Sequence, residues 1–147
     1  MDERVLKCKT PEHCETFARN ALEHNRPDLA KEAIQRAVQI RAEKFGAKSE
    51  VEREALQAVY AYEETLAQKN GKRTRASRTW QMIDRHGIIE AVERAVNRSI
   101  ETQGYRALVA IGLEQYAFEA VISRYPHLFS MEAVRISKER MSEWESS

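Results

Sequence analysis

Apolar side chains recur along the chain every three to four residues, with charged and polar side chains between them. The clearest series lies between residues 28 and 45 and ends at the Phe45-Gly46 pair. It consists of Leu29, Ala30, Ala33, Ile34, Ala37 and Val38, continued by Arg41. This spacing places the apolar groups on one face of a helix and the glutamates, lysines and arginines on the other.

Capping signals bound two further helices in the first half of the chain. A threonine cap followed by proline and glutamate at residues 10–12 predicts a helix that runs to about Asn25. Ser49 and Glu52 form a capping box at the start of a helix over residues 49–69, which an Asn-Gly pair ends. The first half is therefore expected to hold three amphipathic helices.

The second half contains shorter helical patterns separated by glycine and proline. Helices are expected at residues 77–86, 88–98, 104–112 and 113–125, and from residue 131 onward. Gly112 ends one of them because glycine accepts the left-handed conformation, and Pro126 follows the end of the next. Ser130 caps the last helix, with Phe129 and Val134 as a hydrophobic staple.

No segment alternates apolar and polar residues in the manner of a strand, so the sequence predicts an all-α bundle or array of seven or eight helices. A length of 147 residues fits a single domain over residues 1–147. The composition shifts near residue 72, which leaves open a boundary between residues 1–71 and 72–147.

Small residues give part of the first half a resemblance to a known family. Residues 14–42 contain Ala18, Ala30 and Ala37 at positions where two helices cross closely. This stretch resembles one tetratricopeptide-type helical hairpin. The resemblance implies hairpin packing and, where several repeats stack, a concave surface that holds peptides. The chain departs from the family at Cys14, where Trp is usual, and at Ala21, where an aromatic residue is usual.

Composition and charge bear on the compartment in which we expect the protein and on its affinity for nucleic acid. Hydrophobic residues make up 42% and charged residues 32%, with a formal net charge of +1. No apolar run approaches the roughly 20 residues that cross a bilayer, and the start of the chain lacks the layout of a secretory signal. We therefore expect a cytoplasmic, bacterial-type protein without membrane contact. Any affinity for nucleic acid must then come from local charge clustering.

Such a cluster lies in mid-chain, in a stretch that we call the basic segment (residues 69–85). It holds one acid, Asp84, and six basic residues: Lys69, Lys72, Arg73, Arg75, Arg78 and Arg85. The segment is net +5, so the rest of a chain of net +1 is net −4. Arginine forks, the hydroxyls of Thr74 and Ser77, and the free N–H groups of a helix start are the groups that bind phosphate.

Two other interpretations of the basic segment stay open. It can be a solvated connector kept in water by its charge. It can also dock on acidic faces of the helices at residues 28–45 and 49–69. Trp80 offers the same choice, because it can stack on an exposed base beside the arginines or lie in the core with Ile83.

Candidate catalytic and metal-binding groups are few. Cys8 and Cys14, with His13 and His24 nearby, are not spaced like a structural zinc knuckle, and a packed or half-exposed pair of thiols is the expected arrangement. His86 and Glu90 lie four residues apart without a third ligand at recognisable spacing. No phosphate-binding, zinc-protease or nucleophile-elbow motif occurs. The sequence favours a protein that binds no cofactor and no metal, and it favours a non-enzymatic function over an enzymatic one.

A helix-turn-helix resemblance surrounds Gly112, whose apolar neighbours fall at the expected offsets. The helix that would enter the groove offers Gln115, Tyr116, Glu119 and Ser123, which include none of the Arg, Lys and Asn that read bases. An ordinary pair of packed helices fits this stretch better.

We therefore predict a non-enzymatic module that contacts the phosphates of DNA or RNA. The residues expected to do so are Lys72, Arg73, Thr74, Arg75, Ser77, Arg78 and Arg85, with Trp80 as a possible stacking platform. The alternatives are an adaptor that binds a protein partner through the N-terminal hairpin or through the last helix near Met141 and Trp144, and an accessory subunit of a larger enzyme assembly.

Overall fold

The computed structural model describes residues 1–97 and 102–146, and these ranges form nine α-helices, two short 3-10 turns and no strand. The prediction of an all-α fold is confirmed. The α-helices are α1 (Glu3–Leu6), α2 (Pro11–Glu23), α3 (Pro27–Phe45), α4 (Glu50–Asn70), α5 (Ser77–His86), α6 (Ile88–Asn97), α7 (Thr102–Ala110), α8 (Phe118–Arg124) and α9 (Met131–Ser146). The 3-10 turns are η1 (Glu114–Tyr116) and η2 (Pro126–Leu128).

The capping residues act as their sequence positions predict. The hydroxyl oxygens of Thr10, Ser49 and Ser130 accept hydrogen bonds from the backbone N–H three residues further on, at 3.1, 3.2 and 3.1 Å. Gly46 and Gly71 end α3 and α4 in the left-handed conformation, with φ of 87° and 71°. These signals explain why the three helices of the first half begin and end close to their predicted residues.

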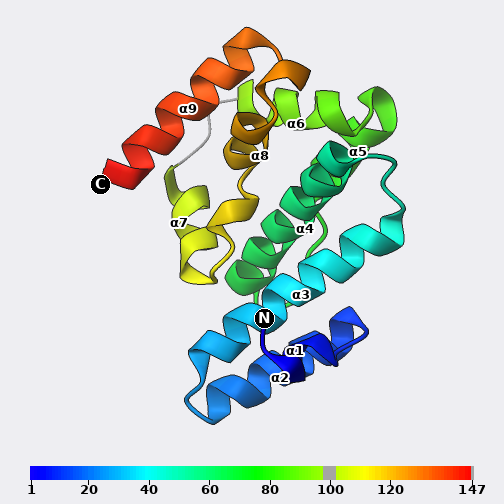
Figure 1. Ribbon diagram of the computed structural model, residues 1–147, viewed down its shortest axis with the longest axis vertical. Coiled ribbons are helices and arrows are strands. Elements are labelled where there is room, and N and C mark those ends of the chain that lie inside the picture. Colours follow the sequence, from blue (N-terminus) through cyan, green and yellow to red (C-terminus); the bar gives the residue numbers. More distant parts are fainter. Residues whose placement is uncertain (98–101, 147) are drawn as a thin grey trace.

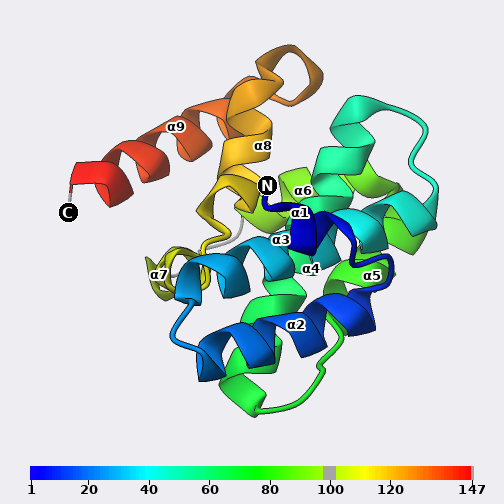
Figure 2. The same cartoon turned by 60° about the horizontal axis from the view of Figure 1, so that its bottom comes forward.

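Helix α4 runs through the middle of the molecule and contacts α3, α6, α7 and α8 (Figure 1). Helices α2 and α3 lie side by side as a hairpin in both views (Figures 1 and 2). The three alanines that carry the tetratricopeptide-like pattern, Ala18, Ala30 and Ala37, are buried. Small side chains thus let the two helices approach closely.

The apolar core joins the two halves of the chain. Val38 and Ala61 pack in one cluster with Leu113. Val59 packs in another cluster with Trp80. Both clusters combine residues from before and after the possible boundary near residue 72.

The expected helix over residues 113–125 is interrupted. The chain makes the 3-10 turn η1, extends at Ala117 (φ −60°, ψ 146°) and only then begins α8. The break places the Tyr116 hydroxyl 3.2 Å from the Gln39 amide nitrogen, which donates to it. Tyr116 and Glu119 are 8% and 3% exposed, so two of the four residues of the helix-turn-helix interpretation are buried.

The sequence predicts an exposed apolar strip on the last helix, α9, but the residues of that strip pack against the rest of the protein. Met141 is half-buried, and Trp144 stacks on Tyr105 with ring centroids 4.5 Å apart. A partner surface near Met141 and Trp144 is therefore not exposed. No helix in the two described ranges has the length and apolar character needed to span a bilayer.

Candidate nucleic-acid interface

The basic segment leaves α4 at Gly71 and crosses to α5 through an irregular connector, residues 71–76. Within it, the Thr74 hydroxyl donates to the carbonyl oxygen of Lys72 at 3.0 Å and accepts from the Asn70 amide at 3.1 Å. The Thr74 hydroxyl thus helps to shape the connector, and its predicted contact with phosphate would compete with these bonds.

A buried carboxylate on α4, that of Glu63, fastens the end of the connector. Its Oε2 accepts hydrogen bonds from the backbone N–H of Ala76 and from Trp80 Nε1, each at 2.7 Å. Glu63 is 3% exposed. The connector is therefore attached to α4 by buried, charge-assisted hydrogen bonds, which are stronger than neutral ones.

Arg73 is occupied by carboxylates of the protein itself. Its Nη1 lies 2.8 Å from Glu64 Oε1 and 3.7 Å from Glu15 Oε1, and its Nη2 lies 3.5 Å from Glu63 Oε1. Of the interpretations of the basic segment, docking on acidic helix faces therefore holds for Arg73. Arg73 consequently brings less free charge to a ligand than its sequence position suggests.

Trp80 lies in the core, as its apolar periodicity with Ile83 indicates. It is 7% exposed. Its ring stacks on Phe45 at a centroid distance of 5.6 Å, and the guanidinium carbon of Arg75 lies 4.9 Å from the ring centroid. These neighbours occupy the space that a stacked base would need, so the possible stacking role of Trp80 does not fit this arrangement.

The other predicted phosphate contacts point to water. Lys72, Ser77, Arg78 and Arg85 are exposed, and none of the three cations forms an ion pair with any described residue. Arg78 and Arg85 are seven residues apart on α5, almost two full turns, so they share one face of that helix. The structure therefore leaves Lys72, Arg75, Arg78 and Arg85 without a carboxylate partner in its described part.

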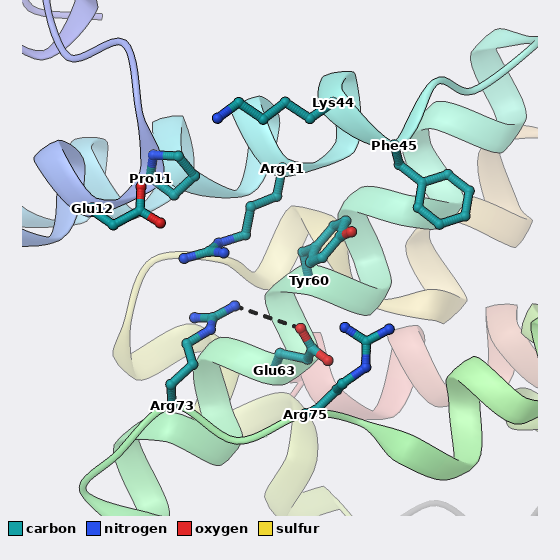
Figure 3. A pocket seen from close by; sticks show the side chains of 9 residues that line it. All are labelled: Pro11, Glu12, Arg41, Lys44, Phe45, Tyr60, Glu63, Arg73 and Arg75. Carbon is teal, nitrogen blue, oxygen red and sulfur yellow. Dashed lines mark ion pairs between the residues drawn. The ribbon is translucent and has the colours of Figure 1, made fainter.

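A pocket of about 520 Å³ opens beside the connector, between α2, α3 and α4. It is lined by Pro11, Glu12, Arg41, Lys44, Phe45, Tyr60, Glu63, Arg73 and Arg75. Figure 3 shows the side chains of Arg41 and Arg73 reaching toward one another from opposite sides. Four cations from two distant parts of the sequence, Arg41 and Lys44 on α3 and Arg73 and Arg75 on the connector, thus line one pocket.

Arg41 and Lys44 are the site residues that sequence reasoning missed. Arg41 Nη2 lies 2.8 Å from Glu15 Oε1, while its buried Nε has no hydrogen-bond partner among the described residues. Lys44 is exposed and forms no ion pair within the described ranges. One signal was available, because Arg41 is the charged residue that continues an otherwise apolar series.

Tyr60 places a phenol at the pocket wall. Burial raises the pKa of its hydroxyl, and the nearby Glu63 carboxylate raises that pKa further, while Arg75, Arg41 and Arg73 act in the opposite direction. The hydroxyl is therefore protonated at neutral pH and can donate a hydrogen bond to an anion.

The groups considered for metal binding or proton transfer are not gathered into a site. His86 Nδ1 lies 3.8 Å from Glu90 Oε2, and Glu90 also pairs with Arg94 at 3.2 Å. Cys8 and Cys14 are fully buried. Across residues 1–97 and 102–146, no three His, Cys, Asp or Glu side chains are grouped so that they could hold a metal ion.

The chain matches no protein-family model, no curated protein and no solved structure. The tetratricopeptide-like character of residues 14–42 and the contact with nucleic acid both remain predictions.

Proposed function

We propose that the protein is a non-enzymatic module that binds the phosphate backbone of a nucleic acid. The contact surface is the group of exposed cations on and beside the connector: Lys44, Lys72, Arg75 and Arg78, which we call the basic face. None of them is paired with a carboxylate of the described chain. This availability of charge is the observation on which the proposal depends, because phosphate contact requires cations that are not already neutralised.

Part of the basic face is carried by a backbone that the protein itself holds in place. Hydrogen bonds to Glu63 fasten Ala76 and Trp80, so the cations between α4 and α5 are carried on an anchored backbone. Lys44 belongs to the last turn of α3 and lines the pocket beside the connector. Contacts of this kind bind phosphate without reading bases, so we expect little sequence preference.

Salt dependence tests the proposal. We expect labelled single- and double-stranded oligonucleotides to bind more weakly as salt rises, by fluorescence anisotropy at several salt concentrations. Replacing Lys72 and Arg78 by Ala removes two exposed, unpaired cations, and should lower the slope of log K against log salt by about 1.5 to 2. The matched control replaces Arg106 and Lys138, which are exposed on α7 and α9, and should leave that slope unchanged. Salt-independent binding, or an equal effect of both double variants, would contradict the proposal.

A protein–protein adaptor is the second candidate. Leu22 at the end of α2 is 59% exposed and Met131 at the start of α9 is 90% exposed. These two side chains lie on separate helices, and the one on the N-terminal hairpin, Leu22, is where a protein partner of the hairpin would make apolar contact. This candidate is preferred if the oligonucleotide titration shows no binding at low salt.

A further inference from the structure

Three side chains of the pocket beside the connector gather around the buried indole of Trp80. The Phe45 ring stacks on it with ring centroids 5.6 Å apart. The guanidinium carbon of Arg75 lies 4.9 Å from the Trp80 ring centroid, and the Tyr60 ring centroid lies 5.3 Å from it. In Figure 3 these three side chains lie together on one side of the pocket, while the ammonium group of Lys44 extends toward the other. An aromatic ring and a cation are thus supported by the same tryptophan.

Trp80 is a fixed support for these side chains. It is 7% exposed, and its Nε1 donates a hydrogen bond to Glu63 Oε2 at 2.7 Å. The same oxygen accepts from the backbone N–H of Ala76, which holds the connector one residue after Arg75. Groups that are ordered before binding lose less conformational entropy when a ligand binds. Phe45 and Arg75 are therefore held in place relative to one another before any ligand arrives.

Phe45 combines this support with access to solvent. It is the last residue of α3, and the chain turns away after it at Gly46, whose φ is 87°. Although the ring rests on Trp80, the residue is 47% exposed. Every base has a π-face, so an exposed aromatic ring can stack a base in any sequence. Phe45 is thus placed to perform the stacking that the sequence suggests for Trp80.

Arg75 places a free charge beside that ring. The residue is exposed and forms no ion pair with any described residue. Glu63, which also lines the pocket, already accepts a hydrogen bond from Trp80 and lies 3.5 Å from Arg73. Since Phe45 and Arg75 both contact Trp80, the ring centre and the guanidinium carbon are separated by no more than the sum of the two centroid distances. A base on the ring and a neighbouring phosphate of the same strand can therefore engage both groups.

We infer that the protein binds single-stranded nucleic acid at this place, with an unpaired base stacked on Phe45 and a neighbouring phosphate on Arg75. The inference rests on the proposed function and names the form of nucleic acid that this part of the surface takes. The bases of a duplex are paired and stacked inside it, whereas a single strand turns a base outward at little cost. Trp80 acts as a positioning residue, because it carries both contacting groups and stays buried.

Fluorescence anisotropy with the full chain tests the contact with a base. The probes are a labelled single strand and the duplex of the same sequence. Phe45→Leu keeps an apolar side chain against Trp80 and removes the ring, so it should weaken single-strand binding by about fivefold or more and leave duplex binding unchanged. Phe45→Trp keeps a ring and should retain single-strand binding. Tyr62→Leu is the matched control, since Tyr62 is 39% exposed on α4 and does not line the pocket, and it should change neither affinity.

Salt dependence separates the ring from the cation. Phe45→Leu removes no charge, so it should lower the affinity for the single strand equally at every salt concentration. Arg75→Ala removes one phosphate contact and should lower the slope of log K against log salt for the single strand by about 0.7. An abasic strand of the same length keeps the phosphates without the bases, so its affinity should not change in Phe45→Leu.

Failure of this inference and failure of the proposed function give different results. An equal loss for single strand, duplex and abasic strand in Phe45→Leu, or no loss for any of them, overturns the stacking contact, and salt-sensitive binding would still support the proposed function. The same conclusion follows if only the duplex binds, or if Phe45→Trp is as weak as Phe45→Leu. Absence of salt-sensitive binding to every probe overturns the proposed function, and the single-strand site with it.

Discussion

Cys8 and Cys14 lie together in a small cluster with Ala37 and Ile40, and both thiols are fully buried. Burial raises the pKa of the Cys14 thiol from 9.0 to about 11, and the neighbouring Cys8 thiol adds to the shift. The thiolate is the form that reacts with electrophiles and binds metals. Cys14 therefore behaves as a small apolar residue at neutral pH, and of the packed and half-exposed arrangements expected from the sequence the packed one is found.

This environment predicts both reactivity and pH dependence for Cys14. Neither thiol should react with a thiol reagent at pH 8 in the folded protein, and both should react once urea unfolds it.

The folded state also holds the Cys14 proton more tightly than the unfolded state. Its contribution to the free energy of unfolding is complete below pH 9 and is lost as pH rises toward 11, by about 1–3 kcal/mol. Urea unfolding at several pH values, compared with Cys14→Ala, measures this slope; an unchanged slope in the variant would assign it to other groups.

At the scale of elements, the connector between α4 and α5 is ordered by contacts with one helix. Glu63 Oε2 accepts from the backbone of Ala76 and from the indole of Trp80, and Arg73 pairs with Glu63 and Glu64. A stretch with few apolar side chains thereby keeps a fixed path. Its order comes from a carboxylate contributed by the helix before it.

The Glu63→Gln variant tests this attachment. The glutamine side chain keeps one acceptor oxygen. Its NH₂ group replaces the other oxygen, so one donor group stands beside the donors of Ala76, Trp80 or Arg73. We expect a loss of about 2–4 kcal/mol in the free energy of unfolding, together with faster hydrogen exchange at Ala76. Glu43→Gln is the control, because Glu43 is exposed on α3 and its side chain forms no hydrogen bond or ion pair within the described ranges. Unchanged exchange at Ala76 in Glu63→Gln would show that the connector is held by other contacts.

The elements also show which parts of the fold the sequence predicts. Caps and 3.6-residue periodicity locate the helices because these signals act between residues only a few positions apart. The break at Ala117 was missed because no local sequence signal marks it, and the contact that accompanies it, between Tyr116 and Gln39, joins residues 77 positions apart. Helix α1 was missed because four residues are too few to display a period.

The candidate site, too, is only partly predictable from the sequence. The positive charge of residues 69–85 is visible in the sequence because it is local. The pairing of Arg73 with Glu15 depends on how α2 and the connector pack together. Sequence reasoning could therefore locate the charge and could not determine which cations remain unpaired.

At the scale of the whole molecule, α9 is joined to the rest by a largely buried ion pair. Arg140 Nη1 lies 3.2 Å from Glu119 Oε2 on α8 and donates to the carbonyl oxygen of Val96 on α6 at 2.7 Å. Burial raises the pKa of Glu119, and the hydrogen bond and charge of Arg140 oppose that shift. Arg140 thus connects three helices and partly stabilises a carboxylate that its surroundings disfavour.

Removing Arg140 should destabilise the protein in a pH-dependent way. In Arg140→Met the Glu119 carboxylate keeps its burial and loses its partner, so we expect a loss of about 3–5 kcal/mol at pH 7. An acid whose pKa is raised in the folded state contributes stability that is complete below its ordinary pKa of 4.5 and is lost as pH rises through the folded pKa. Loss of Arg140 moves the folded pKa of Glu119 further up, so the deficit should be smaller at pH 5 than at pH 7. Urea unfolding at the two pH values measures the difference.

Two further variants decide whether the effect belongs to this ion pair. Arg135→Ala removes an exposed arginine from the same helix, where it pairs with Glu132 and Glu139, and should change stability by no more than about 1 kcal/mol at either pH. Adding Glu119→Gln to Arg140→Met removes the buried charge and should recover part of the loss at pH 7 while abolishing its pH dependence. A deficit that is the same at both pH values, and that Glu119→Gln does not relieve, would mean that Arg140 holds α9 through its bond to Val96 and its packing. The charge of Glu119 would then have no part in joining the last helix to the bundle.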